Sequence, residues 1–502
     1  MIRHFSTLLL GIFSLIQVST AGAQTLEFLD VKEAVILSLQ QNLSLRIEGV
    51  QLLNSQEEII IQKSEFDTTL FASGTQRGSR SADYGEFIGG NQTHNSMVRA
   101  GVSKYLNSGA EVQVTTNYAR NSSGGSSQIL NPAHTSDVGL SLRQPLLEGR
   151  GSEYNLIPLL QAGIEAKRAE LFLKRTALQI MEVAESAYWD LAYAREVQKV
   201  RIASLEVAEK LLEENEERER VGLATNIDVL QSQVFLATSR EAVISADALI
   251  DSSQDRLFRQ MGSNNYPESS VPISPLPDIS TEEIGTSTAL PTILANNPNY
   301  LQQQLNIESW ELSVKSRRNS TLPRVDLIAG IGFSGLDDGL IDSYGNTLEL
   351  DGYDWSAGIE FSVPWGQRSD KARYQQTRNN LYREQLVLED IGQDIKVINR
   401  SNWRNWVTGI ERVKAAKLSL DLAIEQFDRE RTKYESGLAT FRELLQARED
   451  QDEANLRYLN SILGAINAQI INMALDASLP QRYGLSWETT ANLIYPLEET
   501  NP

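Results

Sequence analysis

The stretch VGLAT at residues 221–225 recurs as SGLAT at residues 436–440, a separation of 215 residues (436 − 221). Each copy lies between two long segments of helical periodicity, and an acidic residue, Asp228 or Glu443, stands three positions after its threonine. Glycine suits the end of one helix and threonine the start of the next. The repeat therefore predicts two similar halves, each built around a helical hairpin.

The helices of these hairpins are expected to be unusually long. From 153 to 220, apolar and alanine residues recur every three or four positions, which is typical of a coiled-coil seam. About 65 residues at ~1.5 Å each make a rod of ~95 Å, whereas a bilayer core is only ~30 Å thick. The second long helix is predicted at 368–435, and the return helices at 225–260 and 440–475.

Strands are predicted in both halves, where apolar and polar residues alternate with a period of two. One side of the second pair would face lipid if the strands lie in a membrane. The expected lipid-facing residues are Val325, Leu327, Ile331, Phe333, Tyr353, Trp355, Ile359 and Phe361. The first half offers four strands and the second half two, at 66–75, 97–105, 111–119, 137–144, 323–334 and 353–364. The Gly/Asp/Ser-rich stretch 335–351 is expected to be an exposed loop.

The remaining boundaries follow from composition. Basic residues, an apolar run at 8–16 and the sequence AGA at 21–23 predict a signal peptide over residues 1–23. A proline-rich linker is expected at 263–280. It separates a first repeat, 24–262, from a second, 281–476, and a C-terminal tail occupies 477–502.

Composition excludes several classes of function. The chain has no cysteine and carries a formal net charge of −20, which argues against a thiolate nucleophile, a cysteine metal site and nucleic acid as a partner. No catalytic residue, metal or cofactor is predicted. A hydrolase built on His94 or His134 is the weakest alternative. After the signal peptide there is no run of ~18 apolar residues, so contact with a membrane requires a closed β-barrel.

Three segments together resemble the TolC family of outer membrane efflux proteins. They are LEFLDVKEAVILSLQQNLSLR at 26–46, LRQPLLEGRG at 142–151 and the duplicated GLAT turns, and the resemblance extends over 26–475. It implies a mixed α and β membrane protein with two pseudo-repeats per protomer. Three protomers would share one transmembrane β-barrel, which a long periplasmic α-helical barrel continues. The family usually has four strands per protomer, whereas this chain predicts six. The extra hairpin at 97–119 either joins the barrel or folds outside it.

The resemblance also implies functional positions. The family docks a periplasmic adaptor protein at the helical tips, and the matching residues are Gly222, Leu223, Thr225, Gly437, Leu438 and Thr440. Inward aspartates close the family's periplasmic entrance. The matching positions hold Glu443, Gln446 and, in the first repeat, Asp228. The alternative for the tips is that these turns are simply helix caps. The alternative for Glu443 is a solvated helix residue, and for Asp228 a first-turn carboxylate favoured by the helix dipole.

The predicted function is a passive, non-enzymatic exit duct in the outer membrane, extending into the periplasm. It would serve a tripartite efflux pump or a type I secretion system. The partners would be two further copies of the chain, an adaptor (membrane fusion) protein, outer membrane lipid and, indirectly, an inner-membrane transporter of the RND, ABC or MFS type. The alternative from another class is a structural coiled-coil protein of the envelope without a channel.

Overall fold

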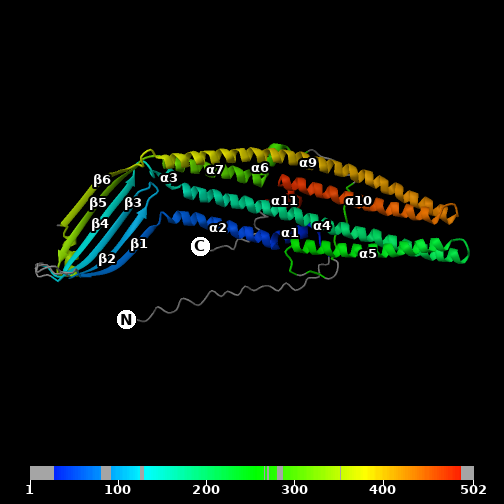
Figure 1. Cartoon of the computed structure of the whole chain (residues 1–502), viewed down its shortest axis with the longest axis horizontal. Helices are drawn as coiled ribbons and strands as arrows, with labels where there is room; N and C mark the ends of the chain where they lie inside the picture. Colours follow the sequence, from blue (N-terminus) through cyan, green and yellow to red (C-terminus); the bar gives the residue numbers. More distant parts are fainter. Residues whose placement is uncertain are drawn as a thin grey trace, which may run out of the picture.

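The computed structural model of the chain describes residues 28–80, 92–124, 129–264, 266–267, 271–279, 287–350 and 352–487. The expected signal peptide, part of the linker and most of the C-terminal tail lie outside these residues. The molecule is elongated, with a sheet at one end and two long helical hairpins reaching to the other (Figure 1). We call the end of the sheet nearest the helices proximal and its far end distal.

Within the described residues, six strands form one antiparallel sheet in the order β1-β2-β3-β4-β5-β6. The hairpin for which the sequence allowed a place outside the sheet forms β2 and β3, in its middle. Five of the six strands are longer than their periodicity predicts, because several continue toward the distal end with polar residues, and β6 is one residue shorter. Their bounds are β1 Thr68–Arg80, β2 Gln92–Tyr105, β3 Glu111–Ser123, β4 Ala133–Pro145, β5 Arg324–Asp337 and β6 Gly352–Ser362.

The strand register places apolar residues on one face of the sheet. Val325 pairs with Phe361, Ile331 with Trp355, and Phe333 with Tyr353, so all eight predicted lipid-facing residues share this face. The same face continues across the other strands through Leu70, Val98, Val102, Val112, Val114, Val138, Leu140 and Leu142. Much of it is exposed in the single chain.

One expectation for the sheet is wrong. The stretch 335–351 is not an open loop, because β5 continues to Asp337 and the helix α8, Leu340–Leu348, follows it. This helix packs on β4 and β5, and its small residues Ser343 and Thr347 are buried there. Glycine and serine are common in turns, so composition alone hid a helix that tertiary packing stabilises.

The first half supplies α1 Val31–Gln41, α2 Leu43–Ser64, α3 Ser152–Asn155, α4 Ile157–Arg220 and α5 Asn226–Gln260. The helix that the sequence predicts from 153 is interrupted at Leu156. Pro158 explains the break, since its ring cannot donate a backbone hydrogen bond and fits the first turn of the new helix, α4.

The second half supplies α6 Leu290–Asn296, α7 Pro298–Asn319, α9 Arg368–Glu435, α10 Phe441–Leu475 and the short α11 Leu479–Arg482. Equivalent caps begin α2 and α7. The side chain of Asn42 accepts hydrogen bonds from the backbone amides of Ser44 and Leu45. The side chain of Asn297 does the same for Asn299 and Tyr300. None of the helices within the described residues combines the length and apolarity needed to cross a membrane.

The main core lies midway along the molecule, where helices of both halves meet the linker. Tyr188 of α4 is fully buried there with Leu257 of α5 and Ile470 of α10. Its hydroxyl donates to the Leu29 carbonyl at 3.0 Å and accepts from the Ser274 amide at 2.9 Å. One side chain thus fixes the N-terminal segment and the linker against the long helix.

The joint between sheet and helices centres on Asn155, at the end of α3. Its amide donates to the carbonyls of Gly149 and Gly151, both at 2.9 Å, and its oxygen accepts from the hydroxyl of Tyr105 at 2.7 Å. Gly109 turns the β2–β3 hairpin with φ +87°, and a Cβ there would collide with the Gly149 carbonyl. The sequence between 142 and 151 is therefore constrained by close backbone packing.

A buried carboxylate anchors the C-terminal segment. Glu185 of α4 is fully buried and forms an ion pair with Arg482 of α11 at 3.2 Å. Removing one partner of such a pair is costly, because the other charge stays buried without compensation.

We expect Arg482→Ala to lower the free energy of unfolding by about 3 kcal/mol, the low end of the range for a broken buried pair, because Arg482 is 31% exposed. Chemical unfolding in detergent, followed by circular dichroism, measures the change. The double variant Glu185→Gln/Arg482→Met is the control and should recover much of the loss. Equal losses in both variants would contradict a role for the uncompensated charge.

Candidate functional site: the helical tips and the polar face of the sheet

Each helical hairpin ends in the same turn. Gly222 and Gly437 adopt φ +77° and +72°, a left-handed conformation that glycine takes without steric cost. The Leu223 amide donates to the Arg218 carbonyl at 2.7 Å, and Leu438 donates to Lys433 at 2.8 Å. Together with the bonds from the two glycine amides, these form a Schellman motif that satisfies the last carbonyls of α4 and α9.

The threonine after each turn starts the return helix through a capping box. Thr225 accepts from the Asp228 amide at 3.3 Å, and Asp228 accepts from the Thr225 amide at 2.8 Å. Thr440 and Glu443 form the same reciprocal pair, at 3.3 and 2.7 Å. The acidic residues of the repeat are therefore the third residues of α5 and α10, where they satisfy helix N-termini.

The turns leave two apolar side chains in solvent at the far end of the molecule. Leu223 is 77% exposed and Leu438 is 80% exposed, and they occupy equivalent positions in the two hairpins (Figure 1). The backbone of each leucine is held by its turn while its side chain covers no core. Both tips thus present a fixed apolar contact point.

The three predicted entrance residues lie near these tips without meeting one another. Asp228 and Glu443 bond within their own caps, and Gln446 donates to Asp450 of its own helix at 3.0 Å. Bonds from the Thr440 backbone and hydroxyl hold the pKa of the Glu443 carboxyl below its usual range. Glu443 therefore stays ionised at pH values where an ordinary glutamate begins to take up a proton.

Sequence reasoning missed the contacts that join the two hairpins. The guanidinium of Arg218 lies over the ring of Tyr434, 4.5 Å from its centre, and the Tyr434 hydroxyl donates to the buried Asn215. Asn215 in turn donates to Ser232 at 2.7 Å. A polar asparagine inside the apolar seam of α4 was the available signal, because a buried amide requires partners.

The second missed group lies on the polar face of the sheet, near its proximal end. Arg143 of β4 forms ion pairs with Asp326 of β5 at 3.1 Å and with Glu360 of β6 at 2.7 Å. Arg324 also reaches Asp326, at 3.0 Å. The sequence signal was that charged, serine and glycine residues occupy most of the positions that alternate with the apolar ones, which indicates that this face contacts water.

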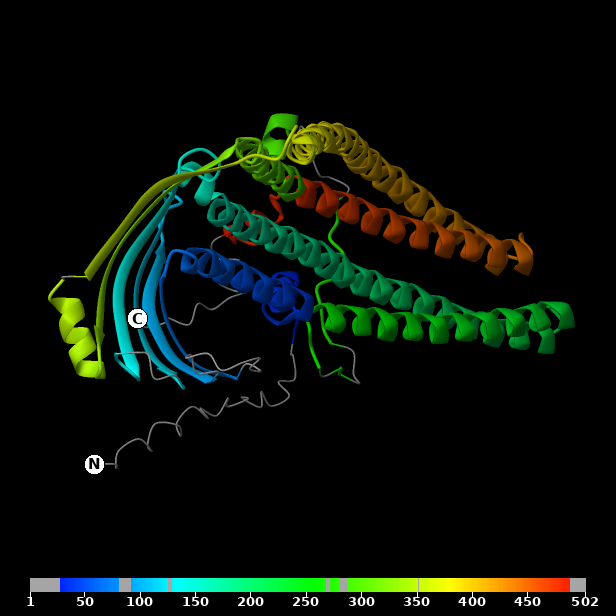
Figure 2. The ribbon, with the colours of Figure 1, turned by 60° about the vertical axis from the view of Figure 1, so that its left-hand side comes forward.

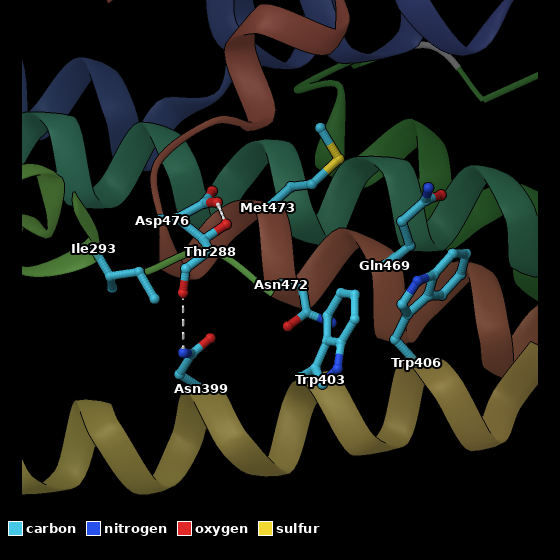
Figure 3. Close-up of a pocket in the computed structure, with 9 residues that line it drawn as sticks. All are labelled: Thr288, Ile293, Asn399, Trp403, Trp406, Gln469, Asn472, Met473 and Asp476. Carbon is cyan, nitrogen blue, oxygen red and sulfur yellow. Dashed lines mark hydrogen bonds between the residues drawn. The ribbon is translucent and has the colours of Figure 1, made fainter. Parts of the chain in front are cut away.

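A cavity of about 170 Å³ lies between α9 and α10, close to the start of α6. Trp403 and Trp406 of α9 face Gln469 and Asn472 of α10 across it (Figure 3). Thr288 closes one end by donating to Asp476 at 2.8 Å and accepting from Asn399 at 3.4 Å. Asn472 donates to the carbonyls of Asn402 and Ala468, and Gln469 accepts from Arg482, so the polar lining groups take part in the packing of the helices.

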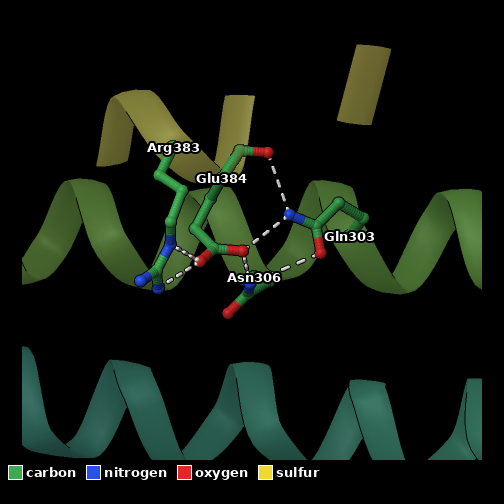
Figure 4. Close-up of polar contacts among 4 residues, drawn as sticks. All are labelled: Gln303, Asn306, Arg383 and Glu384. Carbon is green, nitrogen blue, oxygen red and sulfur yellow. Dashed lines mark hydrogen bonds and ion pairs between the residues drawn. The ribbon is translucent and has the colours of Figure 1, made fainter. Parts of the chain in front are cut away.

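A polar cluster joins α7 to α9. Glu384 accepts from Gln303 at 2.9 Å, from Asn306 at 2.8 Å and from the neighbouring Arg383 at 2.7 Å (Figure 4). The bond from Gln303 is the largest influence that lowers the pKa of Glu384. The group is saturated by protein donors, so we assign it to helix packing.

The two histidines of the weakest alternative lie on the sheet. His134 of β4 bonds through Nδ1 to the Tyr118 hydroxyl at 2.6 Å, and His94 lies in β2, paired with Gly78 of β1. A histidine that bonds to a tyrosine hydroxyl does not form the serine–histidine–carboxylate triad of a serine hydrolase.

Comparison with known proteins agrees with this architecture. Residues 289–470 match the family model described as outer membrane efflux protein. The chain is 23% identical over 328 residues to the outer membrane efflux protein BepC of Brucella suis, and 24% identical over 332 residues to the outer membrane protein TolC of Escherichia coli. These alignments span 62% and 61% of this chain, and 67% and 65% of the relatives, so the chain matches about two thirds of their length.

Among solved structures, the outer membrane protein VceC of Vibrio cholerae is similar, with a TM-score of 0.65 at 16% identity. The match covers 89% of this chain and 96% of VceC. Long helical hairpins joined to a sheet with one apolar face define an outer membrane channel protein with a periplasmic extension. The chain belongs to the TolC-type outer membrane efflux proteins, a family of transport channels. Its location is the outer membrane, from which the helices extend into the periplasm.

The capping boxes allow a prediction about stability at the tips. Thr225→Ala and Thr440→Ala each remove the oxygen that accepts from the third residue of a helix, and each should cost about 1 kcal/mol. Hydrogen exchange at the first turns of α5 and α10 would report the loss locally. Thr225→Ser and Thr440→Ser keep the oxygen and serve as controls. Unchanged exchange in the alanine variants would contradict the assignment.

The lowered pKa of Glu443 gives a pH dependence with a definite sign. Because the carboxyl has a lower pKa in the folded protein than in the unfolded chain, its contribution is present above the unfolded pKa and is lost as pH falls through the folded value. We expect the stability difference between the native chain and Glu443→Gln to shrink in acid. Unfolding measured as a function of pH tests this, and a difference that grows in acid would contradict it.

Proposed function

We propose that this chain is one protomer of a homotrimeric channel that serves as a passive exit duct. The observation that carries the proposal is a sheet with one apolar and one polar face, in which β1 and β6 each pair with only one strand among the described residues. Residues of β1 and β6 are almost all exposed, and both strands are long. Such edges attract another strand, and closure of a barrel is the arrangement that removes them.

The directions of the edge strands favour closure between copies. β1 runs from the proximal to the distal end, and β6 runs back from the distal end, so β6 of one copy would meet β1 of the next in antiparallel fashion. Three protomers would then contribute 6 × 3 = 18 strands. The apolar face would contact outer membrane lipid, and the polar face would line the bore.

The bore would be lined by charged groups. Arg143, Asp326 and Glu360 lie on the polar face, and their pairs leave the carboxylate of Glu360 about half exposed. Hydrated solutes pass more readily over such a surface than over an apolar one. The helices would continue this duct into the periplasm, and their two halves would stem from a duplication that also copied the caps and turns.

The tips would dock a periplasmic adaptor protein, which in turn would couple the duct to an inner-membrane transporter of the RND, ABC or MFS type. Leu223 and Leu438 are exposed apolar residues on rigid turns, a combination that suits contact points. Energy would come from the transporter, and the duct itself would need no catalytic residue, metal or cofactor. The entrance would close where Glu443, Gln446 and Asp228 of three copies approach one axis.

The structural alternative, a coiled-coil envelope protein without a channel, fits the helices but not the sheet. A soluble rod would expose Trp355, Ile359 and Phe361 to water together with the apolar residues of five neighbouring strands. An exposed apolar surface of that extent marks a membrane or protein contact. We therefore prefer the channel.

Trimer closure can be tested by disulfide formation, because the chain contains no cysteine. Ser73→Cys in β1, combined in turn with single cysteines along β6, should give a covalent trimer at one register in lipid. The same material should conduct ions across a planar bilayer. Cysteines in β3 paired with β6 should not cross-link between copies. Monomeric protein without conductance would overturn the proposal.

Docking at the tips can be tested by the double variant Leu223→Asp/Leu438→Asp. Charges in the centre of an apolar contact should abolish adaptor binding and export in cells, while conductance of the purified channel stays unchanged. Cross-linking from the tips to the adaptor measures the contact. Leu223→Met/Leu438→Met is the matched control and should retain export. Full export in the aspartate variant would exclude these residues as contact points.

A further inference from the structure

The helix α8 lies on the apolar face of the sheet, near its distal end (Figure 2). It contacts the sheet through small polar residues. Ser343 and Thr347 are buried, and the Thr347 hydroxyl bonds to that of Ser136 at 2.6 Å. Gly335 makes the close approach possible, because a Cβ there would collide with the Ser343 carbonyl. Ser136 and Gly335 are paired across β4 and β5 on the apolar face.

The rest of α8 is divided between an apolar and a polar side. Ile341 and Leu348 are 80% and 75% exposed, and Leu340 lies beside them on the helix. Asp342 and Asn346 are on the opposite side. A helix on the surface of a soluble protein turns its large apolar side chains toward the core. In α8 the arrangement is the reverse, because serine and threonine make the buried contact and the large apolar side chains point away.

Three hydrogen bonds, made by Tyr344 and Asn346, orient these sides along the sheet. The Tyr344 hydroxyl, on the apolar side, bonds to Thr116 at 3.0 Å, and Thr116 is level with Val138 and Phe333 inside the strands. Asn346, on the polar side, donates to the Leu336 carbonyl at 3.0 Å and to Asp337 at 2.9 Å, at the distal end of β5. The apolar side therefore faces the middle of the sheet, and the polar side faces its distal end.

We propose that α8 is an interfacial anchor that lies in the outer leaflet of the membrane, with Leu340, Ile341 and Leu348 among the acyl chains. The polar side, where Asp337, Asp338 and Asp342 have carboxylates within 4.8 Å of one another, lies at the level of the headgroups and water. An amphipathic helix in the plane of the interface shows this division. The inference rests on the proposed function, because α8 would contact the same outer membrane lipid that surrounds the proposed barrel.

Lipid fits this surface better than a neighbouring copy of the chain. Copies would meet at β1 and β6, whereas α8 rests on β4 and β5 and reaches β3 through Tyr344. On the same face, Leu140 and Ile331 form the next pair beyond Val138 and Phe333 toward the proximal end, and both are exposed, so the apolar side of α8 faces the surface that the proposed barrel offers to acyl chains. The helix would fix the depth of the barrel in the bilayer.

The test uses single cysteines carrying a nitroxide label, in the otherwise cysteine-free full chain reconstituted in phospholipid vesicles. Labels at Ile341 and Leu348 should be relaxed by oxygen, which concentrates in the bilayer, as strongly as a label at Ile359 in the barrel. A label at Asp342 should be relaxed by a water-soluble nickel complex, as should a label at Leu223 on the periplasmic tip. All five positions are exposed, so the labels should not disturb folding.

The outcomes separate the inference from the function on which it rests. If Ile359 is in lipid but Ile341 and Leu348 respond to nickel like Leu223, the anchor is excluded and the barrel stands. If Ile341 and Leu348 become inaccessible to both reagents on assembly, another copy covers the helix and the anchor is likewise excluded. If Ile359 also responds to nickel, the proposed barrel and the anchor both fail.

Discussion

The free edges of the sheet are the constraint on which the architecture depends. A six-stranded sheet with one apolar face must hide that face and satisfy the backbone groups of β1 and β6. Within the described part of the chain, no layer covers most of the apolar face, since Tyr353, Trp355 and Ile359 remain exposed. β1 and β6 each lack a second neighbouring strand there. In the proposed channel, lipid would cover the apolar face and a second copy would pair with each free edge, so that one membrane-embedded ring would solve both problems.

The joint at Asn155 couples the sheet to the helices. Its amide ties together the β2–β3 hairpin, the end of β4 and the first turn of the helical segment through three backbone carbonyls and Tyr105. These bonds leave little freedom for the helices to change direction relative to the sheet at this point. The far ends of the two hairpins are also held together, because Arg218 lies over the Tyr434 ring and the Tyr434 hydroxyl donates to the buried Asn215.

The sequence predicted the periodic parts of the molecule and not the parts decided by tertiary contacts. The predicted helix 368–435 matches α9, because a long seam, the absence of proline and a glycine stop all act locally. In contrast, α8 depends on Gly335 admitting a helix onto the sheet, which no local pattern reveals. The pairing of Arg143 with Asp326 and Glu360 requires the register of three strands that are far apart in sequence.

The tips illustrate how one residue can serve two roles. In the single chain, Glu443 belongs to a capping box, and its carboxylate accepts both of its bonds from Thr440 through Oε2. The cap keeps the carboxylate ionised and fixes its position at the first turn of α10. Three such carboxylates near one axis would repel each other, yet the bonds to Thr440 would persist because they lie within each copy. Capping therefore does not compete with a role at the entrance, since it supplies the charge and the geometry on which such a role would depend.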